Sequence, residues 1–310
     1  MTPDTLRSLI DIHPTVAEAL AASRPLVALE STIITHGMPY PQNIEMAQAV
    51  EDIITEGGAT PALIAVVDGC IKVGLSDEER SALGQTKDAR KTSRADLAFA
   101  VSSGGSAGTT VAATMMVAEW VGIKVFATGG IGGVHQGASE SFDVSADLME
   151  LGRTGVIVVA AGAKAILDIP KTLEVLETQG VPVVGYQTDV MPAFWSRTSD
   201  LPIPLRIDSA QEIAAFQQTR DQMGVDGGML VANPIPAADE IPQAEMQGYI
   251  AQAQADLERL NIKGKEVTPY LLGRILELTD GKSLTSNIAL VKNNARLATE
   301  IAIEMAKALT

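Results

Sequence analysis

The stretch Val156-Ile157-Val158-Val159-Ala160-Ala161-Gly162-Ala163-Lys164 predicts the centre of the fold. Its run of four branched apolar residues is typical of a strand that is buried on both faces. The small residues after it let other parts of the chain or a ligand approach the backbone closely. Lys164 then falls at the carboxyl end of the strand, where open α/β sheets bind their ligands. This lysine is either a surface residue or an amine kept partly dry, and a neutral amine attacks carbonyl carbons.

Strand and helix patterns alternate on both sides of this stretch. Residues 24–29 and 62–67 are strand candidates, and an amphipathic helix pattern over residues 43–56, capped by Asn43, separates them. This order is a βαβ unit, so we expect a mainly parallel sheet flanked by helices, an α/β/α arrangement. Because no repeat, low-complexity tract or linker stands out, we expect a single α/β catalytic domain over residues 1–310.

The composition excludes several classes of protein. The chain has 310 residues, 46% of them hydrophobic, a formal net charge of −15 and one cysteine, Cys70. The negative charge argues against nucleic-acid and anionic-membrane partners. A single cysteine excludes an internal disulfide. With neither a signal-peptide pattern nor an apolar run of membrane-spanning length, we expect a cytoplasmic protein.

Two glycine-rich loops are candidates for ligand binding. Residues 103–110 are rich in glycine and hydroxyl groups and open a helix pattern over residues 111–121, which is typical of an anion site, although the P-loop ending is absent. Residues 128–135 contain four glycines but place His135 where a dinucleotide fingerprint needs its third glycine. This argues against a nicotinamide cofactor. His135 itself is either structural or part of a site.

Charged residues stand close to these loops in the sequence. Lys91 and Arg94 flank two hydroxyl residues and either hold a phosphate or begin a solvated helix. Glu30 ends a strand and is either a site residue or one half of an ion pair. Asp143 and Asp147, four residues apart, suit Mg²⁺ or Mn²⁺, and the alternative is that Asp143 caps a helix.

Two helix starts are expected in the last third of the chain. Thr268 and Pro269 have the order of a cap followed by proline. Ser286 and Asn287 are expected to precede a long C-terminal helix. Asn287 then either presents its amide to a planar ligand or serves as a cap.

Taken together, these segments resemble the pseudouridine-5'-phosphate glycosidase family. The resemblance covers nearly the whole chain, with the motifs in the family's order. It departs at Ala95, where relatives often carry a second arginine, and this is expected to soften phosphate binding or a surface ion pair. The matching segments are VALESTIITHGMP (27–39), GTTVA (108–112), FATGGIGGVH (126–135), FDVSADL (142–148), AGAK (161–164), VANPIP (231–236) and SNI (286–288).

The resemblance implies a reaction and a set of roles. The reaction is the reversible cleavage of pseudouridine 5'-phosphate to uracil and ribose 5-phosphate, formally by a lyase. Lys164 would be the nucleophile, Glu30 the proton donor and Asp143 the ligand of one Mn²⁺ per subunit of a homotrimer. The implied substrate contacts are Lys91, Val111, Ser145, Ala146 and Asp147, and His135 and Asn287 match pocket residues with less defined roles.

The bond to be broken explains why a lysine is needed. Pseudouridine joins its sugar to its base through carbon, so protonating a leaving heteroatom, as paired-carboxylate glycosidases do, would not cleave it. A lysine imine with the ring-opened sugar supplies the required electron sink. Two other readings stay open: another Schiff-base lyase acting on a sugar phosphate, and a non-catalytic phosphosugar-binding protein.

Overall fold

The strands that precede the predicted site residues lie side by side. The computed structural model describes residues 4–262 and 264–307 of the chain. In it β2 (Leu26–Leu29), β7 (Val125–Ala127), β8 (Ile157–Ala160) and β11 (Met229–Ala232) are successive neighbours in one sheet, and all their pairings are parallel. Their carboxyl ends therefore meet at one edge of the sheet, as the sequence predicted.

Two pairings in the sheet are antiparallel. β3 (Thr60–Val67) lies parallel to β2 but antiparallel to β4 (Cys70–Val73) and β6 (Ala107–Thr109). Asp68 and Gly69 connect β3 to β4 with φ angles of 48° and 76°, and a two-residue turn with positive φ at both positions joins antiparallel strands. The prediction of a mainly parallel sheet is confirmed, with the β3–β4 hairpin and the β3–β6 pairing as the exceptions.

The full sheet of the described residues has eleven strands. The remaining ones are β1 (Ile10–Ile12), β5 (Arg90–Thr92), β9 (Val183–Tyr186) and β10 (Leu205–Ile207). The order is β1-β4-β3-β2-β7-β8-β11-β9-β10, with β6 paired to β3 and β5 paired to β6. Lys91 therefore lies on a strand, and the prediction that residues 91–94 could begin a helix is wrong.

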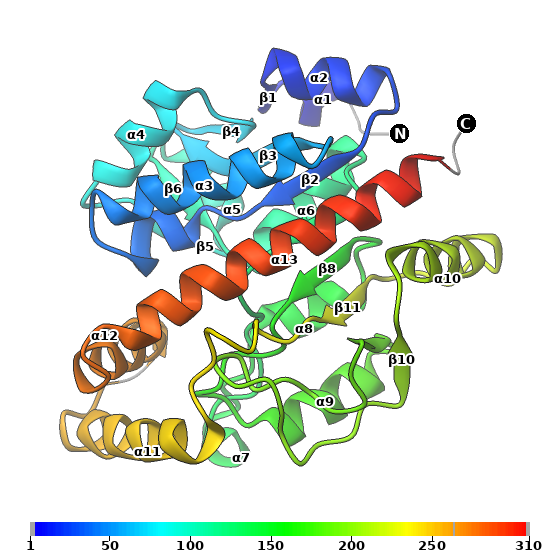
Figure 1. Ribbon diagram of the computed structural model, residues 1–310. Coiled ribbons are helices and arrows are strands. Elements are labelled where there is room, and N and C mark those ends of the chain that lie inside the picture. Colours follow the sequence, from blue (N-terminus) through cyan, green and yellow to red (C-terminus); the bar gives the residue numbers. More distant parts are fainter. Residues whose placement is uncertain (1–3, 263, 308–310) are drawn as a thin grey trace.

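Helices cover both faces of the sheet (Figure 1). α3 (Gln42–Glu56), α10 (Ala210–Gln222) and the long α13 (Lys282–Lys307) pack together on one face, and α13 crosses β2, β7 and β8. α6 (Val111–Val121) and α8 (Ala146–Leu151) pack together on the opposite face, next to α9 (Ile169–Thr178). The other helices are α1 (Asp4–Arg7), α2 (Pro14–Ala21), the π-helix η1 (Ile33–Gly37), α4 (Asp77–Gln85), α5 (Leu97–Ser102), α7 (Ala138–Ser141), α11 (Gln243–Arg259), the 3₁₀-helix η2 (Gly264–Glu266) and α12 (Val267–Leu278).

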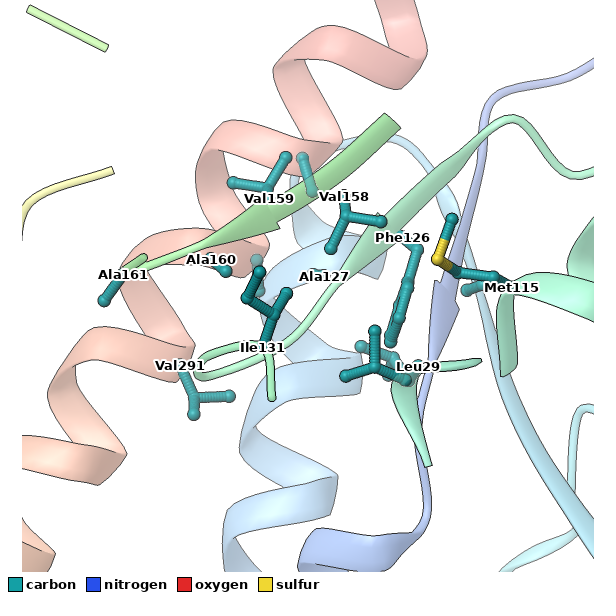
Figure 2. Close-up of a cluster of buried hydrophobic side chains, with 14 of the residues drawn as sticks. Leu29, Met115, Phe126, Ala127, Ile131, Val158, Val159, Ala160, Ala161 and Val291 are labelled. Atoms are coloured by element: carbon teal, nitrogen blue, oxygen red, sulfur yellow. The ribbon is translucent and has the colours of Figure 1, made fainter. Parts of the chain in front are cut away.

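The core lies between the central strands and the helices on either face. Figure 2 shows Phe126 beside Met115 of α6, together with side chains of β8 and Val291 of α13. All residues of β8 are buried, which explains the uninterrupted apolar run in the sequence. Within the described residues, no helix combines the length and the apolar character needed to cross a membrane.

Three predicted helix caps are wrong. α3 begins at Gln42, and the Asn43 amide instead donates hydrogen bonds to the carbonyls of Ile34 and Gly84 at 2.8 and 2.9 Å. α12 begins at Val267, so Thr268 lies inside it. α13 begins at Lys282, which places Asn287 in its second turn rather than before it. Asn43 thus binds backbone groups outside its own helix start, and Thr268 and Asn287 lie within helices that begin earlier.

The central packing gives a stability prediction. Phe126 is fully buried, so Phe126→Ala should lower the free energy of unfolding by about 3–5 kcal/mol, because it removes apolar contacts and leaves a cavity. Chemical denaturation measures this loss. Phe142→Ala is the matched control, since that side chain is 85% exposed and its removal should change stability by less than about 0.5 kcal/mol. Equal effects of the two substitutions would contradict the described core.

Candidate active site

Two adjoining cavities open at the sheet edge where β2, β7 and β8 end. The larger has a volume of about 260 Å³ and the smaller about 70 Å³. Glu30, which follows β2, and Lys164, which follows β8, line both of them. Thr32, Lys91 and Thr268 are also common to both walls. The two residues predicted to be catalytic therefore stand at the junction of the cavities.

The two cavities differ in chemical character. Besides the shared residues, the larger one is lined by Ser93, Asp96, Thr110, Val111, Gly132, His135, Asp143, Ser145, Asp147, Leu167 and Gly264. The smaller one is lined by Ile33, His36, Gly37, Thr128, Gly129, Gly130, Phe194, Pro269, Leu272 and Asn287. The larger cavity thus presents mainly charged and hydroxyl groups, and the smaller one mainly apolar side chains and backbone.

Glu30 is surrounded by groups with opposing effects on its charge. Burial raises the pKa of Glu30 above its ordinary value and is the largest effect. The ammonium group of Lys164, a hydrogen bond donated by the Thr128 hydroxyl and the charge of Lys91 each lower the pKa. The carboxylate of Asp147 raises it further. Glu30 therefore holds its proton to a higher pH than an exposed glutamate, which suits a general acid.

Lys164 is anchored to the glycine-rich loop (residues 128–135). Ala163 forms a parallel bridge with Ile131, and the Lys164 backbone N–H donates to the Ile131 carbonyl at 3.1 Å. The lysine side chain is half-buried, between the strand end and the cavities. The loop after β7 therefore fixes the position of a residue that follows β8.

Positive groups gather on one side of the larger cavity. Lys91 lies in the middle of β5, paired in register with Gly108 of β6. Thr110 caps α6 and Val111 begins it, and both line the cavity. Since a helix N-terminus carries the positive end of the helix dipole, this wall together with Lys91 favours an anion. The glycine-rich residues 103–110 do precede a helix, as predicted, and residues 107–109 of this segment form β6.

Asp147 ties this helix to the glycine-rich loop. One carboxylate oxygen accepts the N–H of Ala112 in α6 at 2.9 Å, and the other accepts the N–H of Gly132 at 2.8 Å. A Cβ atom on Gly132 would lie 2.3 Å from the Ser145 hydroxyl and 2.7 Å from the Asp147 carboxylate, so only glycine fits there. Both oxygens of Asp147 therefore bind backbone groups of the cavity wall.

His135 and Asp143 also line the larger cavity. The His135 backbone N–H donates to the Asp143 carbonyl at 3.0 Å. Burial lowers the pKa of the His135 ring, Asp143 raises it, and the charges of Lys164 and Lys91 lower it again. The net pKa is lowered, so the ring is neutral at neutral pH. Ala146, between Ser145 and Asp147, begins α8 and is not among the described residues that line either cavity.

Asn287 closes the smaller cavity from α13. Its side-chain oxygen is buried and has no hydrogen-bond partner among the described residues. A Cβ atom on Gly129 would lie 3.4 Å from this oxygen, so the amide faces the loop close to the cavity. Leaving a buried acceptor unpaired is costly, and a ligand N–H would remove that cost. Of the two roles expected for Asn287, the amide contact is compatible with its position and the cap is not.

Comparison with known proteins shows which family this chain belongs to. The model of the family described as indigoidine synthase A like protein matches residues 15–304. The chain is 66% identical over 300 residues to the pseudouridine-5'-phosphate glycosidase of Dinoroseobacter shibae, covering 97% of this chain and 98% of that one. It is 67% identical over 302 residues to the enzyme of that name from Mesorhizobium japonicum, covering 97% and 99%. The chain belongs to the pseudouridine-5'-phosphate glycosidase family.

Two solved structures share the family's fold with this chain. The prealnumycin C-glycosynthase AlnA in complex with ribulose 5-phosphate has a TM-score of 0.90 and 36% identity, covering 97% of this chain and 98% of that one. An indigoidine synthase A-like protein from Thermotoga maritima has a TM-score of 0.88 and 34% identity, covering 96% and 97%. The predicted α/β fold is thus confirmed along nearly the whole chain.

Two buried side-chain amides, which the sequence analysis did not predict, form a hydrogen-bonded chain (here called the amide chain) that supports Glu30. The Asn233 side chain, after β11, donates to the Asn294 amide oxygen at 3.0 Å, and Asn294 donates to the Thr128 carbonyl at 2.8 Å. Thr128 in turn holds Glu30. In the sequence, the only sign of this chain of amides is that Asn294, seven residues after Asn287, is a polar residue on the apolar side of the C-terminal helix.

Arg94 does not line either cavity described above. Its guanidinium pairs with the buried Glu150 of α8 at 2.6 Å, so the prediction that it helps to hold a phosphate is not supported, whereas Lys91 and Ser93 do line the larger cavity. Ala95 is exposed and lies outside both walls. A second arginine at that position would therefore lie on the protein surface and would not line either cavity.

The amide chain gives the second prediction. Asn294→Ala should lower the free energy of unfolding by about 1–3 kcal/mol, because it leaves the Thr128 carbonyl and the Asn233 amide buried without their partner. The neighbouring Asn293→Ala is the matched control, since its bond to the Pro234 carbonyl, 3.1 Å long, is only partly buried. Denaturation curves of both variants measure the difference. A larger loss for Asn293→Ala would contradict this role of Asn294.

Proposed function

We propose that this chain reversibly cleaves the C-glycosidic bond of pseudouridine 5'-phosphate to give uracil and ribose 5-phosphate. The observation that carries the proposal is the position of Lys164 and Glu30 at the junction of a polar and an apolar cavity. A bond cleaved between a phosphosugar and a pyrimidine ring needs a nucleophile and a proton donor at that boundary. The names of relatives that are 66–67% identical support this substrate.

The two cavities match the two halves of the substrate. The larger one offers Lys91 and the start of α6 to a phosphate, and Ser145 and the neutral His135 to sugar hydroxyl groups. The smaller one offers apolar walls to a planar ring and the Asn287 amide oxygen to a ring N–H. With a net charge of −15 on the chain, the phosphate depends on this local group of donors.

Lys164 and Glu30 divide the chemistry between them. The Lys164 amine bonds to C1' as the C1'–O4' bond breaks, which opens the sugar ring, and O4' takes the proton that the amine loses. Glu30 protonates C5 of the uracil ring, the electrons of the C1'–C5 bond pass to the base, and the nitrogen lone pair forms an imine with C1'. Water then hydrolyses the imine, which frees the amine and ribose 5-phosphate. One water is consumed for each C-glycosidic bond cleaved. The same steps in reverse order join uracil and ribose 5-phosphate.

The proposed divalent cation would bind in the larger cavity at Asp143. Among the described residues no group of three or more His, Cys, Asp or Glu side chains is placed to hold a metal. Asp143 nevertheless presents a half-buried carboxylate to the cavity. Mn²⁺ and Mg²⁺ take oxygen ligands and often bind through one or two carboxylates, with water and substrate phosphate completing the shell. Mn²⁺ held by Asp143 would offset the negative charge of the phosphate.

Two alternatives and the assembly remain open to direct tests. A different Schiff-base lyase would release an aldehyde from another sugar phosphate and no uracil from pseudouridine 5'-phosphate. A non-catalytic phosphosugar-binding protein would release nothing. The homotrimer implied by the family resemblance is also a proposal, and sedimentation of the intact protein tests it.

The imine proposal predicts a trapped adduct on Lys164. Borohydride added during turnover should attach ribose 5-phosphate to this lysine, as peptide mass spectrometry would show. Lys164→Ala should abolish both the adduct and uracil release. Lys164→Arg should fail equally, because a guanidinium stays protonated and cannot attack. Normal turnover of the arginine variant, or an adduct on Lys91 instead, would refute the assignment.

The position of Glu30 predicts a specific pH dependence of cleavage. Cleavage needs protonated Glu30, so activity should fall as the pH rises through its raised pKa. Thr128→Val removes a hydrogen bond that lowers this pKa, so the alkaline fall should move to higher pH, whereas Thr128→Ser keeps the donor and should not move it. Glu30→Gln should lower kcat by about 100-fold or more. A shift of the Thr128→Val profile to lower pH would contradict the role of Glu30 as the acid.

The metal proposal predicts a loss of both metal and activity. Asp143→Ala should lower the Mn²⁺ content of purified protein, measured by elemental mass spectrometry, and remove most of the uracil release. Glu140→Ala removes the same charge from an exposed position of α7 and should change neither. Full activity of metal-free protein would rule out a catalytic role for the ion.

A further inference from the structure

A third cavity, here called the outer cavity, adjoins the smaller one. Its volume is about 320 Å³. Among the described residues, five line both the smaller and the outer cavity, whereas none lines both the larger and the outer one. The three cavities therefore follow one another from the phosphosugar side to the outer side. The five shared residues are His36, Gly37, Pro269, Leu272 and Asn287.

We propose that the outer cavity receives the part of an acceptor that extends beyond a single pyrimidine ring. In the synthetic direction the enzyme would then join ribose 5-phosphate to N-substituted uracils and other planar carbon nucleophiles larger than uracil. This inference rests on the proposed function, because it uses the same lysine and the same glutamate.

The sizes of the cavities support this division. The smaller cavity has a volume of about 70 Å³ and the outer cavity about 320 Å³, so most of the space beyond the reacting ring lies in the outer cavity. The reacting carbon must lie beside Lys164 and Glu30, which line the inner end of the smaller cavity. The ring edge away from the sugar then faces the shared wall. At that wall Gly37 has no side chain and His36 is exposed, so a substituent meets little obstruction there.

The walls of the outer cavity suit a flat, apolar group. Trp195 is 2% exposed and its indole N–H donates to the Ser283 carbonyl at 3.0 Å, so its only polar atom is already paired. Leu276 and Leu284 line the cavity as half-buried apolar side chains. An aromatic substituent would therefore gain apolar contact without leaving a polar group of Trp195 unpaired. The C-glycosynthase that shares this fold is itself named for prealnumycin and not for pseudouridine.

The reaction balances with the groups already described. The aldehyde of open-chain ribose 5-phosphate and the Lys164 amine form an imine and release one water. The acceptor carbon adds to the imine carbon, and its proton passes to the Glu30 carboxylate. Closure of the sugar ring then expels the lysine amine, which regains its proton from Glu30. One acceptor and one ribose 5-phosphate give one C-glycoside phosphate and one water.

The test fills or widens the outer cavity without touching the catalytic residues. Gly273 of α12 lines it, and a Cβ atom there would meet no atom within 4 Å, so Gly273→Trp narrows the cavity without a backbone clash. Gly248→Trp in α11 is the matched control, since its Cβ position is equally open and it lines none of the three cavities. Leu276→Ala widens the cavity. The probes are uracil, 1-benzyluracil and 3-benzyluracil with ribose 5-phosphate, followed by mass spectrometry.

The expected pattern separates this inference from the proposed function. Wild type should convert uracil and at least one benzyluracil. Gly273→Trp should slow the conversion of the benzyluracil at least tenfold and that of uracil less than twofold. Leu276→Ala should speed the conversion of the benzyluracil. Gly248→Trp should change neither rate. Conversion of uracil without either benzyluracil, or equal slowing of both acceptors in Gly273→Trp, would overturn the inference alone. Failure of wild type with uracil would overturn the proposed function and this inference with it.

Discussion

Parallel pairing of β2, β7 and β8 is the constraint on which the site depends. Leu29 pairs with Ala127, and Ala127 with Val159, so these strands end almost level. Adjacent strands lie about 4.8 Å apart, which brings the residues that follow neighbouring strands within hydrogen-bond reach. Glu30 and Thr128 are such a pair. A shift of one residue in either register would turn these side chains to the other face of the sheet.

The electrostatic character of the site follows from this placement. A carboxyl group at the end of a buried strand loses contact with water, and this raises the pKa of Glu30. The hydroxyl of Thr128 and the ammonium groups of Lys164 and Lys91 limit the rise without removing it. The site therefore places cations within an acidic chain, where they hold the phosphate of a ligand and also influence the proton donor.

The sequence revealed the parts of the site that lie at strand ends and helix starts. Lys164 and Glu30 follow apolar runs, and a rule for parallel sheets suffices to bring them together. The helix at residues 111–121 was predicted with the bounds that the structure shows. Asn287 and Thr268 were misplaced because a polar residue near a helix start resembles a cap, although the helices begin earlier, at Lys282 and Val267. Local patterns do not show whether a polar side chain faces its own backbone or a distant loop.

Long-range polar contacts were beyond the reach of such patterns for the same reason. Asn294 binds a carbonyl 166 residues away, and no spacing rule connects the two. Asn287, Val291 and Asn294 nevertheless share one face of α13, at intervals of four and three residues. Gly129 packs against this face, with Val291 and Asn287 near the position of its missing Cβ atom. One helix thus closes the smaller cavity and supports the loop that holds the proton donor, so a change in acceptor specificity along α13 is physically coupled to the position of Glu30.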